Sequence, residues 1–305
     1  MNNLTILVNT GIAALLAALC CAANAATLSV DCDAGNTIAS VYATIKPGDT
    51  VLVSGLCKEQ VNIPPEVTRV TFDGQKKTII QHPGGQQASP HAFYTRGKEI
   101  TIKNFTVMGG QDGIHLSGPA SAVIDGNLVT KNGGRGIHID KGSIARILNT
   151  TVEQSGGIGI DVTGASYAYI GVFIPRVPAL APNTIRNNGG PGINIERTSG
   201  AWIVGNTISG NKESGITVHR NAQADVIANT INGNGGDAIT VTYNGGVNSD
   251  SEPRKDGPNR TTQNNAGAGI RCAIGGYVDG PPGTLAGAKG AKDIDKGCVD
   301  RTAAP

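Results

Sequence analysis

The middle of the chain alternates apolar and polar positions in a pattern that returns at a nearly fixed interval. One landmark, Gly-Ile-x-Ile or a close variant, recurs after 23, 21, 35, 23 and 23 residues; it begins at Gly113, Gly136, Gly157, Gly192, Gly215 and Ala238. A second landmark, an Asn with Val or Ile two or three residues later, recurs after 23, 22, 34, 23 and 23 residues; it begins at Asn104, Asn127, Asn149, Asn183, Asn206 and Asn229. Alternation predicts strands, and two series with one period predict a repeated coil.

Each repeat holds three short alternating stretches separated by Gly and Asn corners, for example Ala201–Val204, Asn206–Ile208 and Gly215–Val218. A strand this short cannot bury itself, but coils stacked ~4.8 Å apart give every strand a partner on both sides. We therefore predict an all-β fold, a right-handed parallel β-helix. Its inward positions are Ile and Val, and the recurring Asn residues form a ladder at one corner.

The same pattern sets the expected domain organisation. We predict one solenoid domain over residues 26–276, with the most regular coils in 100–245 and a proline-rich insertion loop at 171–182. Apolar residues at i, i+3, i+4 and i+7 within Asn36–Ile45 predict a short amphipathic helix that caps the first coil. Residues 277–305 are rich in Gly and Pro and lack the period, so they are predicted to be a C-terminal tail.

Residues 1–25 have the pattern of a cleaved export signal. Gly11–Ala23 is apolar, and it ends in the small-x-small sequence Ala23-Asn24-Ala25. The segment before it has no Lys or Arg, so an uncleaved membrane anchor is the alternative. After cleavage we expect a secreted or periplasmic protein without stable membrane insertion. The cysteines that remain lie two near each end, which predicts two disulfides; the pairs are Cys32–Cys57 and Cys272–Cys298.

Composition and charge narrow the classes of partner. The chain has 44 Gly in 305 residues and only 4% aromatic residues, which favours many tight turns and a core without large rings. Lys and Arg number 25 against 23 Asp and Glu, and no basic run exceeds two residues. These features argue against nucleic acid as the partner. The cysteines show no spacing typical of a zinc site.

The rungs over Phe105–Val241 and the opening segment Ile45–Pro64 resemble the pectin-lyase-like superfamily of right-handed β-helix repeat proteins. Within it, the chain is similar to the group that includes the periplasmic nitrous-oxide-maturation factor and the mannuronan epimerases. The resemblance implies the solenoid fold, which hydrolases, lyases, epimerases, adhesins and tail fibres share. The epimerase signature Asp-Pro-His-Asp and the polygalacturonase signatures are absent, and Arg176–Ala181 resembles the Arg-x-Pro-x-x-Arg of pectate lyases but ends in Ala181.

Candidate chemistry must lie on the outward positions of the Gly-Ile strands. The third positions hold His115, His138, Gly159, Asn194 and Thr217, and the fifth hold Ser117, Asp140, Asp161, Glu196, His219 and Thr242. Stacking would place Asp140, Asp161 and Glu196 one above another, close enough to perturb one another's pKa or to share a hard cation such as Ca²⁺. The alternative is a solvated face whose acids are neutralised by the basic residues that follow them.

Two sets of candidates result. The candidate catalytic residues are Asp140, Asp161, Glu196, His138 and Lys141. The candidate substrate-binding residues are His115, Arg197, His219, Arg220 and Trp202. His115 and His138 could also pair as acid and base or as metal ligands, but Gly159 leaves a third ligand missing. Trp202 either stacks on a sugar or packs under the insertion, while His82 and His91 lie beside prolines in a loop-like stretch and are weaker candidates.

Two functions of different class remain. The absence of catalytic signatures favours an exported, non-catalytic β-helix that binds a polysaccharide or a surface partner. The alternative is an enzyme, a lyase, epimerase or hydrolase, that acts on a uronate-type polymer through the stacked carboxylates, with a basic residue to neutralise the substrate.

Overall fold

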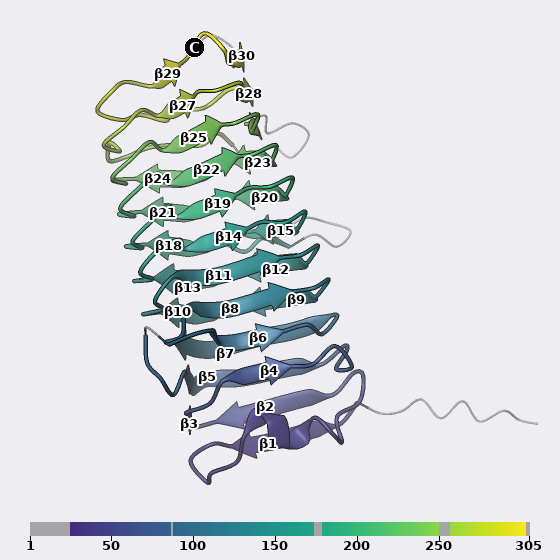
Figure 1. The fold of residues 1–305 in the computed structure, drawn as a ribbon. Helices are drawn as coiled ribbons and strands as arrows, with labels where there is room; N and C mark the ends of the chain where they lie inside the picture. Colours follow the sequence, from purple (N-terminus) through teal and green to yellow (C-terminus); the bar gives the residue numbers. More distant parts are fainter. Residues whose placement is uncertain (1–24, 87, 174–178, 250–256, 303–305) are drawn as a thin grey trace, which may run out of the picture.

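The computed structural model describes residues 25–86, 88–173, 179–249 and 257–302. Within them the chain winds into a stack of coils (Figure 1), and the predicted right-handed parallel β-helix is confirmed. The predicted export signal lies outside the described residues except for Ala25. The basic end of the lyase-like motif, Arg176, also lies outside them.

The coils contribute strands to three walls that run along the solenoid. Wall 1 is a ten-stranded parallel sheet made of β4 (Val61–Ile63), β6 (His91–Thr95), β8 (Asp112–Ser117), β11 (Arg135–Asp140), β14 (Ile160–Val162), β19 (Ile193–Ile195), β22 (Ile216–His219), β25 (Ile239–Thr242), β27 (Ile270–Cys272) and β29 (Lys292–Ile294). Wall 2 is made of β1 (Thr27–Asp31), β2 (Thr50–Ser54), β5 (Thr71–Gln81), β7 (Ile100–Met108), β9 (Ser121–Asp125), β12 (Ile144–Leu148), β15 (Tyr167–Ile170), β20 (Gly200–Val204), β23 (Gln223–Ile227), β26 (Gly246–Asn248), β28 (Tyr277–Asp279) and β30 (Val299–Arg301).

Wall 3 is the shortest, and it is made of β3 (Leu56–Cys57), the ends of β5 and β7, β10 (Leu128–Thr130), β13 (Thr151–Glu153), β18 (Thr184–Arg186), β21 (Thr207–Ser209) and β24 (Thr230–Asn232). Walls 2 and 3 form one 18-stranded sheet because β5 and β7 are long enough to run through both. Beside them, β16 (Val172–Phe173) and β17 (Ala179–Leu180) form a small antiparallel pair at the insertion.

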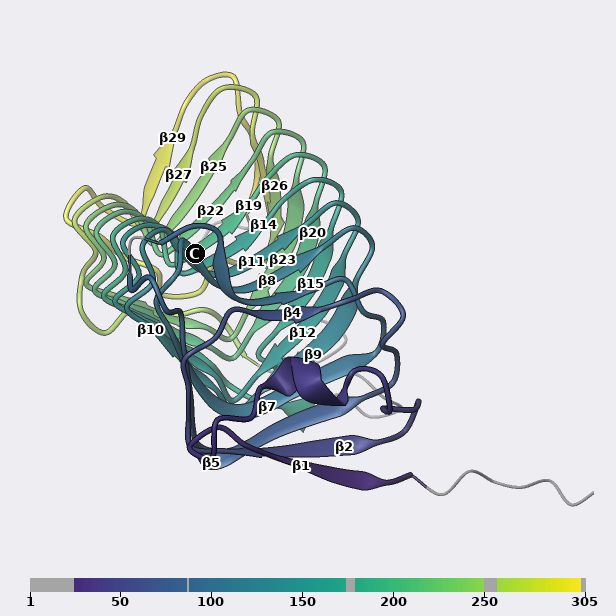
Figure 2. The same cartoon turned by 60° about the horizontal axis from the view of Figure 1, so that its bottom comes forward.

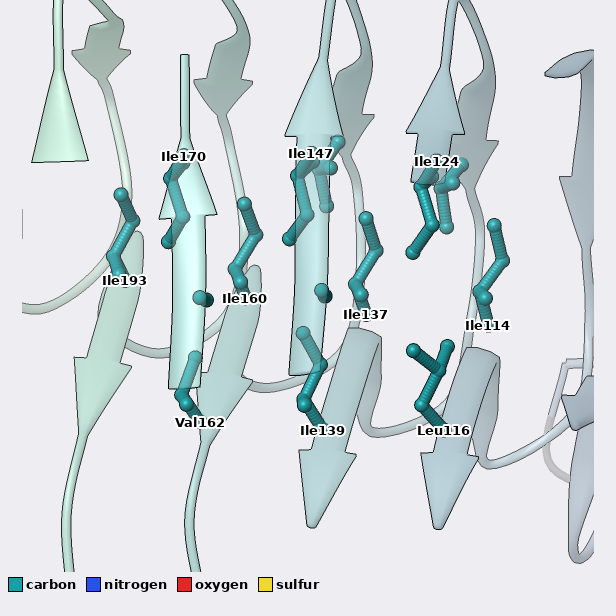
Figure 3. Packing of buried hydrophobic residues seen from close by; sticks show 14 of the residues in the cluster. Ile114, Leu116, Ile124, Ile137, Ile139, Ile147, Ile160, Val162, Ile170 and Ile193 are labelled. Carbon is teal, nitrogen blue, oxygen red and sulfur yellow. The ribbon is translucent and has the colours of Figure 1, made fainter. Parts of the chain in front are cut away.

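Inward Ile and Val side chains of successive coils stack in columns between the walls. Two columns that face each other in Figure 3 are Ile114, Ile137, Ile160 and Ile193 on wall 1, and Ile124, Ile147 and Ile170 on wall 2. All are fully buried. Burying one such side chain contributes roughly 1.5–3 kcal/mol, so the columns form a core without many aromatic rings. The fully or nearly fully buried Phe rings lie in the N-terminal coils, at Phe72, Phe93 and Phe105.

Buried Asn side chains form ladders at two corners. In the first ladder the side chain of Asn206 accepts the backbone N–H of Asn183 (3.1 Å), and its own amide donates to the carbonyl of Ile170 (2.9 Å). The second ladder, which the sequence analysis did not foresee, repeats this bonding through Asn188, Asn211, Asn234 and Asn265. Each amide therefore satisfies backbone groups that would otherwise be buried without partners.

The strand register corrects the phase of one repeat. Ile137 pairs with Ile160 and not with Ile158, and Thr150, not Asn149, accepts the N–H of Asn127. The segment from Gly157 reads Gly-Ile twice, and a slip of two residues keeps the inward and outward alternation, so the pattern alone cannot separate the two phases. Gly159 is the true landmark, because a Cβ there would lie 2.5 Å from the carbonyl oxygen of Gly192.

The predicted capping helix over Asn36–Ile45 is wrong. The chain forms only one 3-10 turn, η1 (Ile38–Val41), at the N-terminal end of the stack (Figure 2). Thr37, Ile38 and Val41 are β-branched, which lowers helix propensity. Ile38 is fully buried, and the half-buried Val41 and Tyr42 also pack against the core.

The C-terminal end also differs from expectation. Strands continue past residue 276, because β28, β29 and β30 pair in parallel with the preceding coils. The links between these strands are short and contain Gly and Pro, so the repeat is not recognisable in the sequence there, although the coils continue. Both predicted disulfides, Cys32–Cys57 and Cys272–Cys298, are confirmed, one near each end. Among the described residues, no helix has the length and apolarity needed to span a bilayer.

Candidate functional site

The outer face of wall 1 carries one column of aligned side chains through most of its coils. From β6 onward the column holds Tyr94, His115, His138, Asp161, Asn194, Thr217 and Thr240. Asp161 therefore stacks on His138, while Asp140 pairs with Ser117 in a neighbouring column. The expected stack of Asp140, Asp161 and Glu196 is wrong, and the phase slip described above explains why. The Ca²⁺ site predicted from that stack loses its geometric basis.

A compact group of titratable side chains takes its place, which we call the His/Asp cluster: His91, Asp112, His115, Arg135, His138, Asp140 and Asp161. Asp112 lies at its centre, with 4% of its side chain exposed. Its Oδ2 lies 3.2 Å from Nδ1 of His138 and 3.3 Å from Nδ1 of His91, and its Oδ1 lies 3.4 Å from the guanidinium of Arg135. Three strands, β6, β8 and β11, thus converge on one carboxylate.

The rest of the cluster is equally well connected. Nε2 of His115 lies 3.1 Å from Oδ1 of Asp140, and its ring stacks on that of His138 with centroids 4.2 Å apart. Asp161 accepts hydrogen bonds from Nε of Arg135 (2.7 Å) and from the amide of Asn194 (2.8 Å). These bonds fix the side chains of four successive coils relative to one another, because each donor and acceptor lies on a paired strand.

The surroundings shift the pKa values in the directions that keep the carboxylates charged. Burial raises the pKa of Asp112, but hydrogen bonds from His138 and His91 and the charge of Arg135 outweigh it and hold that pKa well below its usual range. The same competition, with bonds from His115 and Ser117, lowers the pKa of Asp140 to about 2. Burial lowers the pKa of His115, although the bond to Asp140 opposes the shift.

These charges assign the tautomers of two imidazoles. Nδ1 of His138 donates to the carboxylate of Asp112, so the neutral ring would carry its lone pair on Nε2. Nε2 faces the Oδ2 of Asp161 at 3.8 Å. By the same argument His115 donates from Nε2 to Asp140 and keeps the lone pair on Nδ1. The cluster therefore presents two imidazoles, each oriented by a carboxylate.

A shallow groove of about 420 Å³ begins at the cluster and runs over the next coils. Its lining on the strand side is polar and consists of Arg135, Asp161, Asn194, Glu196, Thr217 and His219. Its opposite rim is built from Gly157, Gly189, Gly190, Pro191 and Glu213. Side chains are excluded at Gly189, where a Cβ would lie 2.0 Å from the carbonyl oxygen of Gly156. The rim therefore stays low and the groove stays open.

Glu196 lies in this groove but is neutralised by its neighbours. Its Oε2 lies 2.7 Å from Arg220 and 3.3 Å from Nε2 of His219, and its Oε1 lies 3.7 Å from Nε of Arg197. This part of the face matches the alternative in which acids and bases offset one another. Lys141 is exposed at the corner that follows β11, and Arg197 and Arg220 occupy the equivalent corners of later coils.

Trp202 is not part of this site. It lies on wall 2, where its indole meets the ring of Tyr169 edge to face at 6.1 Å and packs against the buried group of Val172, Val204 and Ile227. The packing alternative is thus the one the structure favours for this residue. Its position above Asp225 in the next coil agrees with the repeat.

Sequence reasoning missed two members of the cluster and ranked a third, His91, as a weak candidate. Asp112 and Arg135 each precede the Gly of a Gly-Ile-His sequence and pair with each other at the 23-residue interval, so the repeat could have revealed them. His91 was assigned to a loop-like stretch, but it begins β6 and pairs with Asp112. No local pattern marks it, because the strand starts directly after Pro90.

A family model described as "Right handed beta helix region" matches residues 91–252 and 171–276. The chain belongs to the right-handed beta helix family. Searches of solved structures find similar folds, while no curated protein was found to match. Polysaccharide-active enzymes are prominent among the similar structures.

Two of these structures illustrate the likeness. An alginate lyase from Paenibacillus sp. str. FPU-7 has a TM-score of 0.56 at 17% identity, covering 90% of this chain and 99% of its own. The A-module of the Azotobacter vinelandii mannuronan C-5 epimerase AlgE6 has a TM-score of 0.51 at 13% identity, covering 92% and 88%. At this level of identity the likeness shows the shared fold.

Proposed function

We propose that the protein is an exported enzyme that acts on a uronate-type polysaccharide by general acid–base catalysis at the His/Asp cluster. One observation carries the proposal: His138 is oriented by the buried carboxylate of Asp112, and its Nε2 faces Asp161, which lines the polar groove. The enzymes among the similar structures, named as an alginate lyase and mannuronan or alginate epimerases, support this class. The two disulfides fit an extracellular or periplasmic protein.

The chemistry begins with removal of the proton on the sugar carbon next to the carboxyl group. Nε2 of His138 accepts this proton, and the imidazolium that forms is stabilised by Asp112 and Asp161. Arg135 uses Nε and one terminal nitrogen for its bonds to Asp161 and Asp112, and its side chain is 36% exposed. Its remaining N–H groups can bind the substrate carboxylate and stabilise the charge that develops there.

The groove provides the binding surface for neighbouring sugars. Asn194, Thr217 and His219 offer hydrogen-bonding groups suited to hydroxyls along a chain. Whether the carbanion then expels the glycosidic oxygen, as in a lyase, or is reprotonated on the other face, as in an epimerase, depends on a second proton donor. The product analysis below separates the two.

The test is a screen of purified protein against polymannuronate, polyguluronate and polygalacturonate. Unsaturated ends report a lyase, a changed C-5 configuration by NMR reports an epimerase, and new reducing ends alone report a hydrolase. We expect His138→Gln to lower turnover by roughly 10²–10⁴-fold, and Thr240→Val, in the same column but outside the groove, to leave it unchanged. A polymer that binds in the groove but is never modified would support the non-catalytic binding function instead.

A further inference from the structure

Three donor atoms of the His/Asp cluster lie at the mutual distances that a metal ion imposes. Nδ1 of His91 lies 3.2 Å from Nδ1 of His115 and 3.3 Å from Oδ2 of Asp112, and the latter two atoms lie 3.7 Å apart. Ligand atoms held about 2.1 Å from a tetrahedral ion are roughly 3.4 Å from one another. We infer that His91, His115 and Asp112 form a binding site for a divalent transition-metal ion of the zinc type.

The arrangement of the cluster brings several lone-pair-bearing atoms to one point. Nε2 of His115 is bonded to Asp140, which turns its Nδ1 toward His91 and Asp112. Oδ2 of Asp112 lies 3.3 Å from Nδ1 of His91, and Nε2 of the same His91 ring lies 3.2 Å from Nδ1 of His115, so either ring nitrogen of His91 can face the site. A cation at this point would satisfy all three donor atoms at once.

The surroundings supply the second layer that metal-binding histidines usually have. Asp140 bonds to the far nitrogen of His115, which fixes the ring orientation and raises the basicity of Nδ1. Asp140 is therefore a positioning residue and not a ligand in this proposal. The side chain of His91 is 18% exposed and closes the site on the outer side, so an ion can enter by a rotation of that ring.

The donor set determines the class of ion. Two imidazole nitrogens and one carboxylate oxygen suit Zn²⁺ and its borderline neighbours, whereas Ca²⁺ takes six to eight oxygen ligands. The site thus differs from the Ca²⁺ site predicted from sequence in both position and chemistry. The metal site can also be tested separately from the proposed acid–base function, because metal binding is measured without any substrate.

The test uses the full mature protein, treated with a chelator and then titrated with Zn²⁺ by calorimetry and with Co²⁺ by visible absorption. We expect one ion per chain with micromolar or tighter affinity, and no competition from millimolar Ca²⁺. His91→Ala should weaken Zn²⁺ binding by at least about 100-fold, and Asp140→Asn by roughly 10–100-fold with an altered Co²⁺ spectrum. His219→Gln, a histidine of the groove outside the three-ligand set, should bind Zn²⁺ as the wild type does.

Absence of Zn²⁺ binding by the wild type, or full binding by a folded His91→Ala protein, would overturn the inference. If His91→Ala does not fold, the Asp140→Asn spectrum decides, because that variant keeps all three ligands. Zn²⁺ binding is measured without polysaccharide, so loss of binding by His91→Ala bears on the metal site alone. Failure of the polymer screen alone would leave the metal site standing.

Discussion

The two halves of wall 1 have the same backbone arrangement but carry different outward side chains. In the N-terminal coils the outward column holds Tyr94, His115, His138 and Asp161, and its neighbours include Asp112 and Arg135. In the following coils the same column holds Asn194, Thr217 and Thr240, and at the C-terminal end Arg271 and Asp293 occupy it and form an ion pair with each other. The inward Ile and Val positions continue through both halves without change.

This contrast separates the scaffold from the chemistry. Threonine suits an outward strand position, so the C-terminal column is what the fold alone would select. Burying Asp112 and the imidazoles around it costs desolvation energy that only their mutual bonds offset. Such side chains gathered on four successive coils are therefore the sign of a site.

Removing one coil from each half gives the largest expected contrast. Deletion of residues 206–228 takes out 23 residues, one complete coil, so the following coil moves up in register and brings Thr240 and Thr242 to the places of Thr217 and His219. Deletion of 127–149 also takes out one coil of 23 residues, but it removes Arg135 and His138. We expect both proteins to fold and only the first to keep proton abstraction, with weaker polymer binding because Thr242 takes the place of His219.

Circular dichroism and thermal melts measure the folding part of this prediction. A deletion of 11 residues within 206–228 is the control, because it turns inward positions outward and should abolish cooperative melting. If the full-coil deletions melt as poorly as the half-coil deletion, the coils are not independent stacking units.

The Asn ladder offers a second contrast, now within the scaffold. Asn206 is fully buried, and its side chain accepts from Asn183 and donates to Ile170 and Asn229. Asn206→Ala would remove the acceptor of the Asn183 N–H and the donor to the carbonyl of Ile170, so we expect a loss of roughly 3 kcal/mol in the free energy of unfolding. Asn206→Thr should lose less, since Thr150 holds the same ladder position with its hydroxyl.

Denaturant unfolding of the two variants measures the difference. Equal losses for Ala and Thr would mean that packing volume, and not hydrogen bonding, sets the role of the ladder. Polysaccharide turnover should be unaffected in either folded variant, because the ladder lies at a corner away from the cluster.

A smaller effect is expected from pH. Burial lowers the pKa of His219 below its usual 6.5 in the folded protein, with the charge of Arg220 adding to the shift and that of Glu196 opposing it. As the pH falls below 6.5 the unfolded chain takes up this proton first, so stability falls until the pH reaches the folded pKa and is then constant. We expect His219→Gln to lose less stability than wild type between about pH 7.5 and about pH 5.5.

Melting curves at the two pH values test this, with Arg96→Gln as the control. Arg96 is exposed after β6, is not among the charges that shift the pKa of His219, and an arginine has no proton to exchange in this range. A His219→Gln protein with the pH dependence of the wild type would show that other groups control the acid limb.

The fold was largely predictable from the sequence, because the solenoid repeats one local rule. Period and alternation predicted the walls, the Ile and Val core and one Asn ladder. Two local features were predicted wrongly. Ile158 follows a Gly as Ile160 does, so the sequence alone does not show which of them pairs with Ile137. The segment that holds Ile38 has the apolar spacing of a helix, but its β-branched residues form only a 3-10 turn.

The site was less predictable, because it depends on register between coils. His138, Asp140 and Asp161 were candidates, yet the two-residue slip placed Asp161 in the wrong column. Asp112 and His91 can be recognised as neighbours only when β6 and β8 are paired, because this pairing brings Oδ2 of Asp112 to 3.3 Å from Nδ1 of His91. A list of the outward residues in the sequence does not give such distances between coils.

The most direct test of the account is hydrogen exchange on the substrate. Wild-type protein is incubated in D₂O with a uronate polymer that it binds, and deuterium at the carbon next to the carboxyl group is measured by NMR. If His138 removes that proton, the wild type and Thr240→Val will incorporate deuterium or form unsaturated ends, and His138→Gln will lose this activity by at least about 100-fold. Undiminished proton transfer in a folded His138→Gln protein would contradict the assignment of the His/Asp cluster as the active site.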